Sequence, residues 1–398
     1  MSPRRRILVL GAGRYYVPVL RQLRAAGFTV LAVDRDPDAP GKAEVEEFAP
    51  IDFSDTPALL EWARERELDG VLPVNDFGTR SAARLAEALG LPGIRPAAAQ
   101  AANDKGEMRD LWAAAGLAQP DYRVVHDLAG ARAAARELGF PCVFKPTDCG
   151  GGGRGISVVR AEGDVEWSYA WAEPYLTNRR LVVEDYLEGI EMTVESVSLG
   201  PGDVRILAMS DKVKDLEART RVATSLEFPS QRPPAVLAEV ESLVQDAVAA
   251  IGVEIGMAHT EVIVTAAGPR LVELGARGGG GHVFHTLIEQ ACGLAAPAFT
   301  AALLCGGRPE LPPLQRRGAC YRFFQQTPGV VRAVRGVAEA RALPGVLDLE
   351  VVVRPGDRVE ALENSLKRVG WIATGGEDFA AAVAAADAAE RRVEIELE

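Results

Sequence analysis

The sequence predicts an α/β protein whose first part is doubly wound and whose later part is α+β, and three observations carry this prediction. Strand patterns at 4–10 and 29–33 flank a helical pattern that ends at Gly27, which makes a strand–helix–strand unit. Five glycines fall within residues 147–155, between two short apolar runs. Residues 260–265 and 269–274 flank a short turn, as the two strands of a β-hairpin do. Alternating strands and helices followed by hairpins indicate more than one packed module.

The composition excludes several classes of protein. The chain has 398 residues, 48% hydrophobic and 25% charged, which suits two or three domains with packed cores. A net charge of −12 argues against a nucleic-acid binder, which normally presents a basic face. No run of 18 or more apolar residues is present, so we expect no membrane span. The cysteines lack metal or CxxC spacing, which predicts reduced thiols in a cytoplasm; they are Cys142, Cys149, Cys292, Cys305 and Cys320.

Residues 1–96 predict a Rossmann-like domain. After the first strand–helix–strand unit, strands near 48–51 and 70–74 alternate with helices near 57–66 and 79–89. The turn Gly11-Ala12-Gly13 resembles a dinucleotide-binding turn, but Tyr16 occupies the place of the third glycine of the NAD fingerprint. That glycine permits close helix–strand packing. We therefore favour a Rossmann-like scaffold without a dinucleotide over an NAD-dependent dehydrogenase.

The middle of the chain contains a glycine-rich loop inside a predicted hairpin. Asn103-Asp104-Lys105 opens a helix, a second helix covers 128–138, and strands at 142–146 and 156–159 enclose the loop 147–155. Glycines expose backbone N–H groups and let a loop close over phosphates. Inter-domain linkers are also glycine-rich, but they usually carry serine and do not lie inside a hairpin. We interpret the loop as a phosphate lid.

An acidic stretch follows the predicted strand at 181–183. It runs from Glu184 to Glu191 and leads into predicted antiparallel strands at 192–199 and 204–209. Lys212 and Lys214 come next, and the sequence leaves open whether they face substrate or solvent. An amphipathic helix is predicted over 232–251.

The hairpin at 260–274 places two glutamates opposite one another. If the loop is Ala266-Ala267-Gly268, paired positions sum to 534, so Glu261 faces Glu273. Directly opposed side chains lie ~5 Å apart at Cβ, and two carboxylates at that distance repel by about 3 kcal/mol at an effective dielectric of ~20. A shared cation would remove this cost, and hard oxygen ligands suit Mg²⁺. The alternative is two solvated glutamates on an exposed face.

A guanidinium and a glycine run follow this pair. Arg277 precedes glycines 278–281, which feed a helical pattern that ends at Gly293. Bare backbone N–H groups at the start of a helix make an anion site. A carboxylate pair, an arginine and an anion site therefore converge within ~20 residues.

Taken together, these motifs resemble the ATP-grasp superfamily in their order along the chain. The resemblance is to carboxylate–amine ligases of the L-amino-acid-ligase or biotin-carboxylase type, which have a Rossmann-like pre-grasp domain. It implies an ATP-grasp domain over 97–310, with a lid subdomain at about 120–185 and a core at about 186–310. A C-terminal lobe, 311–398, would follow, with strands at 320–324, 330–334 and 345–353 and a helix at 377–390.

The resemblance also implies roles for individual residues. It predicts ATP and Mg²⁺ (or Mn²⁺) as cofactors, Glu261 and Glu273 as metal ligands and Arg277 as the catalytic group. Substrate contacts are expected from Gly279, Gly280 and His282. Many family members carry Asn two residues after the second glutamate, where this chain has Gly275, which leaves the number of metal ions open. The expected ATP-binding residues are Lys105, Lys145, Gly151, Gly152, Gly153, Gly155, Glu184, Tyr186, Leu187 and Glu191.

The function implied is activation of a small carboxylate, such as an amino acid, as an acyl phosphate for attack by an amine, with release of ADP and phosphate. One alternative is a bicarbonate-activating carboxylase of the biotin carboxylase or purine type. Another is a regulatory protein that binds ATP without turnover. The expected partners are small carboxylates and amines, with no nucleic acid and no membrane, and the chain is compatible with a homodimer. The motifs do not choose the substrate.

Overall fold

The computed structural model describes residues 4–148, 150–215 and 220–398, and it begins with a four-stranded parallel sheet. The strand order is β3-β2-β1-β4, and helices cover both faces. The predicted α/β fold class and the doubly wound start are therefore confirmed. The elements are β1 (Arg6–Leu10), α1 (Val17–Ala25), β2 (Thr29–Val33), β3 (Glu47–Ala49), α2 (Thr56–Arg64), β4 (Gly70–Pro73) and α3 (Asp76–Leu89).

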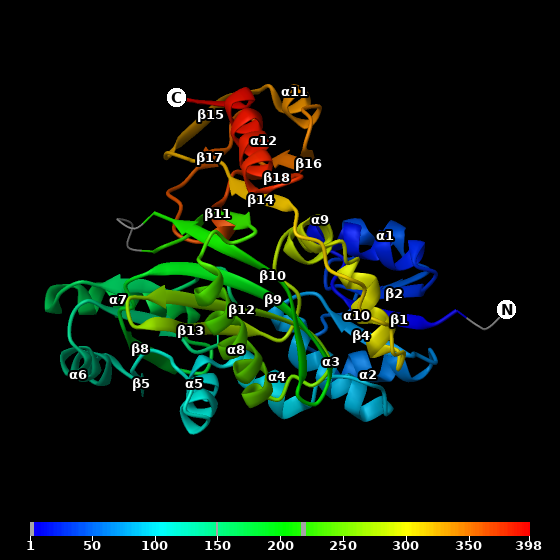
Figure 1. Ribbon diagram of the computed structural model, residues 1–398, viewed down its shortest axis with the longest axis horizontal. Coiled ribbons are helices and arrows are strands. Elements are labelled where there is room, and N and C mark those ends of the chain that lie inside the picture. The colour runs from blue at the N-terminus through cyan, green and yellow to red at the C-terminus, as the bar shows by residue number, and fades with distance from the viewer. Residues whose placement is uncertain (1–3, 149, 216–219) are drawn as a thin grey trace.

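One face of this sheet is covered by a helix from much later in the chain. Helices α2 and α3 pack on the face that presents Leu8 and Leu10. The opposite face, with Ile7 and Val9, packs against α1 and against α10 (Ala296–Leu304), which lies beside β4 and β1 in Figure 1. No local pattern in residues 1–96 indicates this helix, because α10 begins 223 positions after β4 ends, at 296 against 73.

The turn after β1 is closed by an aromatic ring. A Cβ added at Gly11 would lie 3.2 Å from the ring carbons of Tyr16, so the ring packs directly against this glycine. Gly11 also has a φ of +128°, which only glycine adopts readily. The ring thus occupies the surface where a dinucleotide would need close approach to the backbone.

A small antiparallel sheet spans the residues predicted as the lid subdomain, and we keep that name for it. Its strand order is β5-β8-β6-β7, and α6 and α7 cover one face around a core that includes Phe144 and Val183. Two short helices, α4 (Pro96–Asn103) and α5 (Lys105–Ala114), connect it to the first domain. The elements are β5 (Tyr122–Val125), α6 (Leu128–Leu138), β6 (Cys142–Pro146), β7 (Ser157–Val159), α7 (Val165–Ala172) and β8 (Leu181–Asp185).

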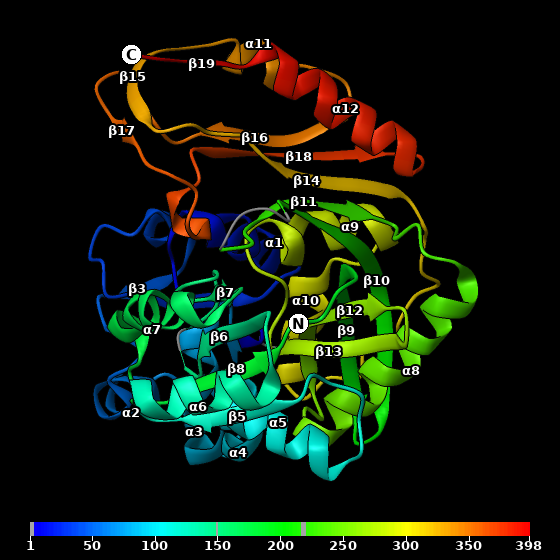
Figure 2. The same ribbon diagram turned by 90° about the vertical axis from the view of Figure 1, so that its left-hand side faces the viewer.

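An eight-stranded sheet is the centre of the molecule. Its order is β13-β12-β9-β10-β11-β14-β18-β16, so strands from beyond residue 311 continue the sheet of the core (Figures 1 and 2). The predicted boundary near 310 therefore separates two parts of one sheet. The strands are β9 (Ile190–Gly200), β10 (Asp203–Lys214), β11 (Ala223–Phe228), β12 (Gly256–Thr265), β13 (Gly268–Gly275), β14 (Gly318–Phe323), β16 (Val346–Val351) and β18 (Gly370–Gly376).

Helices and a fourth sheet, with the strand order β17-β15-β19, complete the described part of the molecule. Helix α8 (Pro234–Ile251) packs on β10, β12 and β13, and α12 (Phe379–Arg392) packs on β14 and β18. The predicted helix after the glycine run begins as a π-helical turn, η5 (Val283–Leu287), and continues as α9 (Ile288–Cys292). Further elements of the C-terminal lobe are β15 (Gly329–Arg335), α11 (Val337–Arg341), β17 (Arg358–Val359), η6 (Ser365–Lys367) and β19 (Glu394–Leu397).

No single helix among the described residues is long and apolar enough to cross a membrane. Only the pair Val283–Cys292 and Ala296–Leu304 reaches that length and composition together, with a bend of 111° between them. The cysteines Cys142, Cys292, Cys305 and Cys320 are buried free thiols, and Cys149 lies outside the described residues.

The register of the β12–β13 hairpin differs from the predicted one near its turn. The loop has two residues rather than three, because Thr265 pairs with Gly268 and these positions sum to 533. An irregularity between Glu261 and Val262 then shifts the register by one, so that Glu261 pairs with Glu273 after all. The predicted three-residue loop is wrong, and a bulge on β13 restores the predicted pairing of the glutamates.

Candidate active site

A cavity of about 800 Å³ lies where the first domain, the lid subdomain, the central sheet and the C-terminal lobe meet. Such a volume is within the usual range for small-molecule sites. Many of the residues singled out in the sequence line it: Lys145, Gly151, Gly152, Gly153, Tyr186, Leu187, Glu191, Lys212, Lys214, Glu261, Glu273, Gly275, Arg277 and Gly280.

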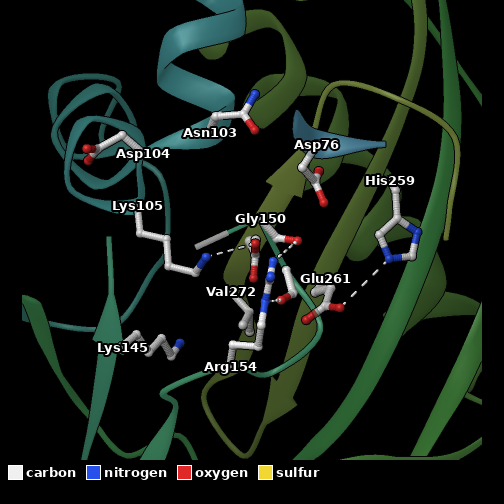
Figure 3. A network of polar contacts seen from close by, with 12 residues as sticks. Asp76, Asn103, Asp104, Lys105, Lys145, Gly150, Arg154, His259, Glu261 and Val272 are labelled. Carbon is white, nitrogen blue, oxygen red and sulfur yellow. Dashed lines mark hydrogen bonds and ion pairs between the residues drawn. The ribbon is translucent and has the colours of Figure 1, made fainter. Parts of the chain in front are cut away.

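Each glutamate of the opposed pair is held by a lysine. Glu273 Oε1 accepts from Lys105 Nζ at 2.9 Å, and Glu261 Oε1 accepts from Lys212 Nζ at 2.5 Å. Figure 3 shows Lys105, Arg154, Glu261 and His259 within one network of polar contacts. Burial opposes ionisation of Glu261, but the charges of Lys212 and His259 outweigh it and hold its pKa well below the ordinary value.

The donor set suits a magnesium ion. Two carboxylates from neighbouring strands face one cavity, and Mg²⁺ is usually held by one or two carboxylates together with substrate phosphates. Within the described ranges no group of three or more His, Cys, Asp or Glu side chains is placed to hold a metal ion. A metal here would therefore rely on Glu261, Glu273 and ligand oxygens.

Lys105 occupies the first turn of α5, where a cation opposes the helix dipole. The carboxylate of Asp104 caps this helix by accepting from the backbone N–H groups of Gly106 and Glu107 at 2.9 and 3.1 Å. Together with Glu273, this cap offsets the charge of the lysine. Lys105 is buried, and Glu273, which it contacts, lines the cavity.

His259 and Glu195 are site residues that sequence reasoning missed. His259 Nδ1 bonds the carboxylate of Glu195, and its Nε2 lies 3.8 Å from Glu261 Oε1 (Figure 3). Burial alone would lower the pKa of His259, but Glu195 and Glu261 raise it to about 9. Period-2 alternation could have found both residues, because His259 and Glu261 share one face of β12 and Glu195 pairs with His259 across the ladder.

Arg277 projects into the cavity and is held by a residue of the first domain. Its Nη2 lies 2.6 Å from Asp76 Oδ2, and its Nη1 donates to the carbonyl of Gly278 at 2.9 Å. Burial favours the neutral form of Asp76, but Arg277 lowers the pKa of this carboxyl below its ordinary value. Asp76 fixes the guanidinium from the start of α3, 201 positions away in sequence.

This ion pair also accounts for Gly275. A Cβ added there would lie 3.2 Å from Asp76 Oδ1 and 3.3 Å from Arg277 Cζ. The asparagine that many family members carry at this position would therefore crowd the Asp76–Arg277 pair, whose side chains would have to move by a few tenths of an ångström. The absence of a side chain at Gly275 leaves the space in which Asp76 and Arg277 pair.

The glycine-rich loop is folded over the cavity. Gly150, Gly151, Gly152 and Gly153 all have φ between 62° and 77°, a conformation that other residues rarely adopt. Arg154 donates to the carbonyls of Gly150 and Gly151 at 2.9 and 3.2 Å. The backbone N–H of Ser365, in the C-terminal lobe, donates to the Gly152 carbonyl at 3.0 Å, which joins the loop to that lobe. Gly155 lies at the far end of the loop, against Pro146 and Tyr175.

The structure places Glu184 beneath the cavity and not in its wall. Its side chain is 2% exposed and accepts from Arg109 Nη2 at 2.8 Å and from Lys145 Nζ at 2.5 Å. Burial raises the pKa of a carboxyl, but Arg109 and Lys145 hold that of Glu184 below its ordinary value. Both oxygens contact these two cations, so Glu184 anchors Lys145, and a direct contact of Glu184 with ATP stays a prediction.

The segment after Glu184 does line the cavity. Tyr186 and Leu187 form part of the wall, and the Tyr186 hydroxyl accepts from Arg221 at 2.8 Å. Glu191 is paired with Lys212 at 2.8 Å and with Lys214. Both lysines line the cavity, so a contact with substrate stays a prediction for them.

Two of the three expected substrate residues lie behind the wall. The N–H of Gly279 is donated to Glu195 Oε2 at 3.1 Å, so this part of the predicted anion site already holds an internal carboxylate. The ring of His282 is 6% exposed and packs edge-on against Tyr321 at 5.6 Å. Burial lowers the pKa of His282, which therefore favours the neutral ring. Gly280 lines the cavity as expected.

Comparison with known proteins identifies the family. Residues 21–93 match the ATP-grasp N-terminal domain, 110–280 the ATP-grasp domain, and 322–398 the L-amino acid ligase C-terminal domain 2. The chain is therefore a member of the ATP-grasp superfamily of ligases. Within that superfamily, its C-terminal lobe is of the L-amino acid ligase type.

Curated relatives and solved structures agree with this assignment. A formate-dependent phosphoribosylglycinamide formyltransferase of Burkholderia vietnamiensis is 33% identical over 188 residues, 46% of each chain. The matched part thus spans about half the length of such relatives, while the same enzyme of Rhodococcus jostii is 28% identical over 98% of this chain and 95% of its own. The crystal structure of L-amino acid ligase from Bacillus licheniformis shares the fold, with a TM-score of 0.85, 21% identity and full coverage of both chains.

Proposed function

We propose that this protein is an ADP-forming, ATP-dependent carboxylate–amine ligase. The observation that carries the proposal is one cavity that brings together Glu261, Glu273, Arg277 and Lys145 under a glycine-rich loop. Carboxylates for a metal, cations for phosphates and a rigid guanidinium are what phosphoryl transfer requires, since its catalysis is mainly positioning and electrostatic stabilisation.

In the first step, a carboxylate oxygen of the first substrate attacks the γ-phosphorus of ATP. The bond from the γ-phosphorus to the β–γ bridging oxygen breaks, and ADP leaves with the electron pair. In the second step, the lone pair of an amine forms the C–N bond and the acyl C–O bond breaks. Inorganic phosphate leaves with the bonding pair and accepts the proton that the nitrogen loses.

The residues of the cavity divide these tasks. Lys145, anchored by Glu184, and the loop over Gly151–Gly153 would hold the phosphates, and Glu191 would accept from the ribose hydroxyls. Mg²⁺, when bound by Glu261 and Glu273, supplies charge neutralisation to the phosphates. Arg277, fixed by Asp76, would face the transferring phosphoryl group and the acyl oxygen with its planar fork.

The L-amino acid ligase type of the C-terminal lobe supports an amino acid as a substrate. Similarity to formyltransferases named as formate-dependent supports a second candidate, in which formate is the carboxylate and phosphoribosylglycinamide the amine. Both candidates use an acyl phosphate. The test must therefore include both, and bicarbonate as the carboxylase alternative.

The experiment is a phosphate-release screen of the full chain with ATP and Mg²⁺. Its arms are paired amino acids, formate with phosphoribosylglycinamide, and bicarbonate alone, and Glu273→Gln serves as the control for contaminating ATPases. Hydroxylamine should trap the intermediate as a hydroxamate, with ADP as coproduct. Release of AMP and pyrophosphate would mean adenylation and would overturn the mechanism. ATP binding without turnover in every arm would favour the regulatory alternative.

A further inference from the structure

Arg368 lines the active-site cavity, and its guanidinium has no acidic partner among the described residues. It lies between η6 and β18 in the C-terminal lobe, with its guanidinium carbon 3.3 Å from the centroid of the Phe323 ring. Its Nη2 donates to the Ala223 carbonyl at 2.9 Å, while its buried Nε has no hydrogen-bond partner among the described residues. Among the described residues, no carboxylate forms an ion pair with Arg368, and the titratable groups that act on it are Tyr321 and Tyr15.

Two other arginines of low side-chain exposure, one of them in the cavity wall, do have acidic partners. Arg109 is paired with Glu184, and Arg277 with Asp76. Burying a cation without a counter-ion is costly, which is why buried charges are normally paired. Burial lowers the pKa of Arg368 to about 10, so the group is still a cation at neutral pH. A ligand anion would supply the missing partner.

The surroundings of Arg368 are aromatic. Tyr15, Tyr321 and Trp371 line this end of the cavity, and the rings of Tyr15 and Trp371 lie 4.9 Å apart. This aromatic end of the cavity lies next to the glycine run that follows Arg277. The Tyr321 hydroxyl packs directly against Gly281 of that run, since a Cβ added at Gly281 would lie 2.7 Å from it. A single guanidinium among aromatic rings suits a monoanionic carboxylate attached to an apolar side chain.

We propose that this end of the cavity binds the amine substrate, and that this substrate is an α-amino acid with a bulky apolar or aromatic side chain. The inference rests on the proposed ligase function. Arg368 binds the α-carboxylate of the amine substrate, and Tyr15 and Trp371 contact its side chain. This leaves the α-nitrogen as the nucleophile that attacks the acyl phosphate. In the proposed function the ATP phosphates bind, through Mg²⁺, at Glu261 and Glu273. A carboxylate bound by Arg368 is therefore not the one that receives the phosphoryl group.

Binding of L-phenylalanine to the full chain tests this directly and requires no turnover. Isothermal titration calorimetry with Mg²⁺ and a non-hydrolysable ATP analogue compares L-phenylalanine with L-phenylalaninamide, which lacks the carboxylate, and with inorganic phosphate. We expect binding of L-phenylalanine to be about 10- to 100-fold tighter than that of the amide, as for a charged hydrogen-bonded pair. Arg368→Gln should abolish this preference. Arg354→Gln, an exposed arginine of the same lobe, should retain it.

Unchanged affinity for the ATP analogue shows that the Arg368→Gln chain is folded. A second variant, Tyr15→Ala, removes a side chain that is 40% exposed and should weaken L-phenylalanine more than L-alanine. Equal binding of L-phenylalanine and its amide, no binding of L-phenylalanine, or tighter binding of phosphate at Arg368 would each overturn the proposal.

A hydroxylamine competition separates this inference from the proposed function. L-Phenylalanine in the amine site should suppress hydroxamate formation at lower concentration than the amide does. If hydroxamate forms and both compounds suppress it equally, the ligase function stands and the amine site is wrong. If no carboxylate gives hydroxamate while L-phenylalanine binds through Arg368, the site stands and the ligase function is wrong.

Discussion

Replacement of Glu184 by glutamine tests the buried ion cluster that holds Lys145. Glu184 accepts from Arg109 Nε and Nη2 at 2.9 and 2.8 Å and from Lys145 Nζ at 2.5 Å, with only 2% of its side chain exposed. Glutamine keeps the shape but carries no charge, so two cations remain in the interior without their anion. Removing one partner of such a buried cluster typically costs about 3–5 kcal/mol, and we expect a loss of that size.

Urea unfolding at constant pH measures this loss. Far-UV circular dichroism follows the whole chain, and tryptophan fluorescence includes the stacked Trp167 and Trp171 of the lid subdomain. The matched control is Glu188→Gln, an exposed residue four positions on, which should change the free energy of unfolding by less than about 0.5 kcal/mol. A loss below about 1 kcal/mol for Glu184→Gln, or one equal to the control, would refute the reasoning.

The pH dependence has a defined sign. The pKa of Glu184 is lowered in the folded protein, so its contribution is present above the unfolded value of about 4.3. It is lost as the pH falls through the lower folded value. The stability difference between the wild type and Glu184→Gln should therefore be constant near neutral pH and narrow below about pH 4.3. A difference that grows on acidification would contradict the assignment.

Further predictions concern the active site. Glu273→Gln should abolish phosphate release while circular dichroism stays unchanged, and full activity in that variant would remove it from the proposed metal site. Arg277→Lys should be nearly as poor as Arg277→Ala, with a rate loss of about 10²–10³ and little change in nucleotide affinity, because lysine lacks the fork. Asp76→Asn should share part of that loss, and wild-type rates would show that the pair is not required. Saturating Mg-ATP should protect the loop at 150–155 from proteolysis, and Lys145→Ala should raise the ATP concentration needed; unchanged cleavage would argue against a lid.

The sequence by itself determined what is local. The bounds of β2, β6 and α6 agree with the predicted ones, because strand and helix periodicity and glycine stops act over neighbouring residues. The opposition of Glu261 and Glu273 was predictable for the same reason, since a hairpin pairs residues close in sequence. The length of the hairpin loop was not predictable from the sequence. A bulge on β13 offsets the shorter loop, and the amino-acid composition carries no separate signal for such a bulge.

Only the tertiary structure decided which distant residues meet. Asp76 contacts Arg277 across 201 positions, Lys105 contacts Glu273 across 168, and Arg368 contacts Ala223 across 145. The order of strands in the central sheet and the packing of α10 on the first domain bring these pairs together. Local periodicity carries no information on strand order, because any partner strand satisfies the same backbone hydrogen bonds and buries the same apolar face.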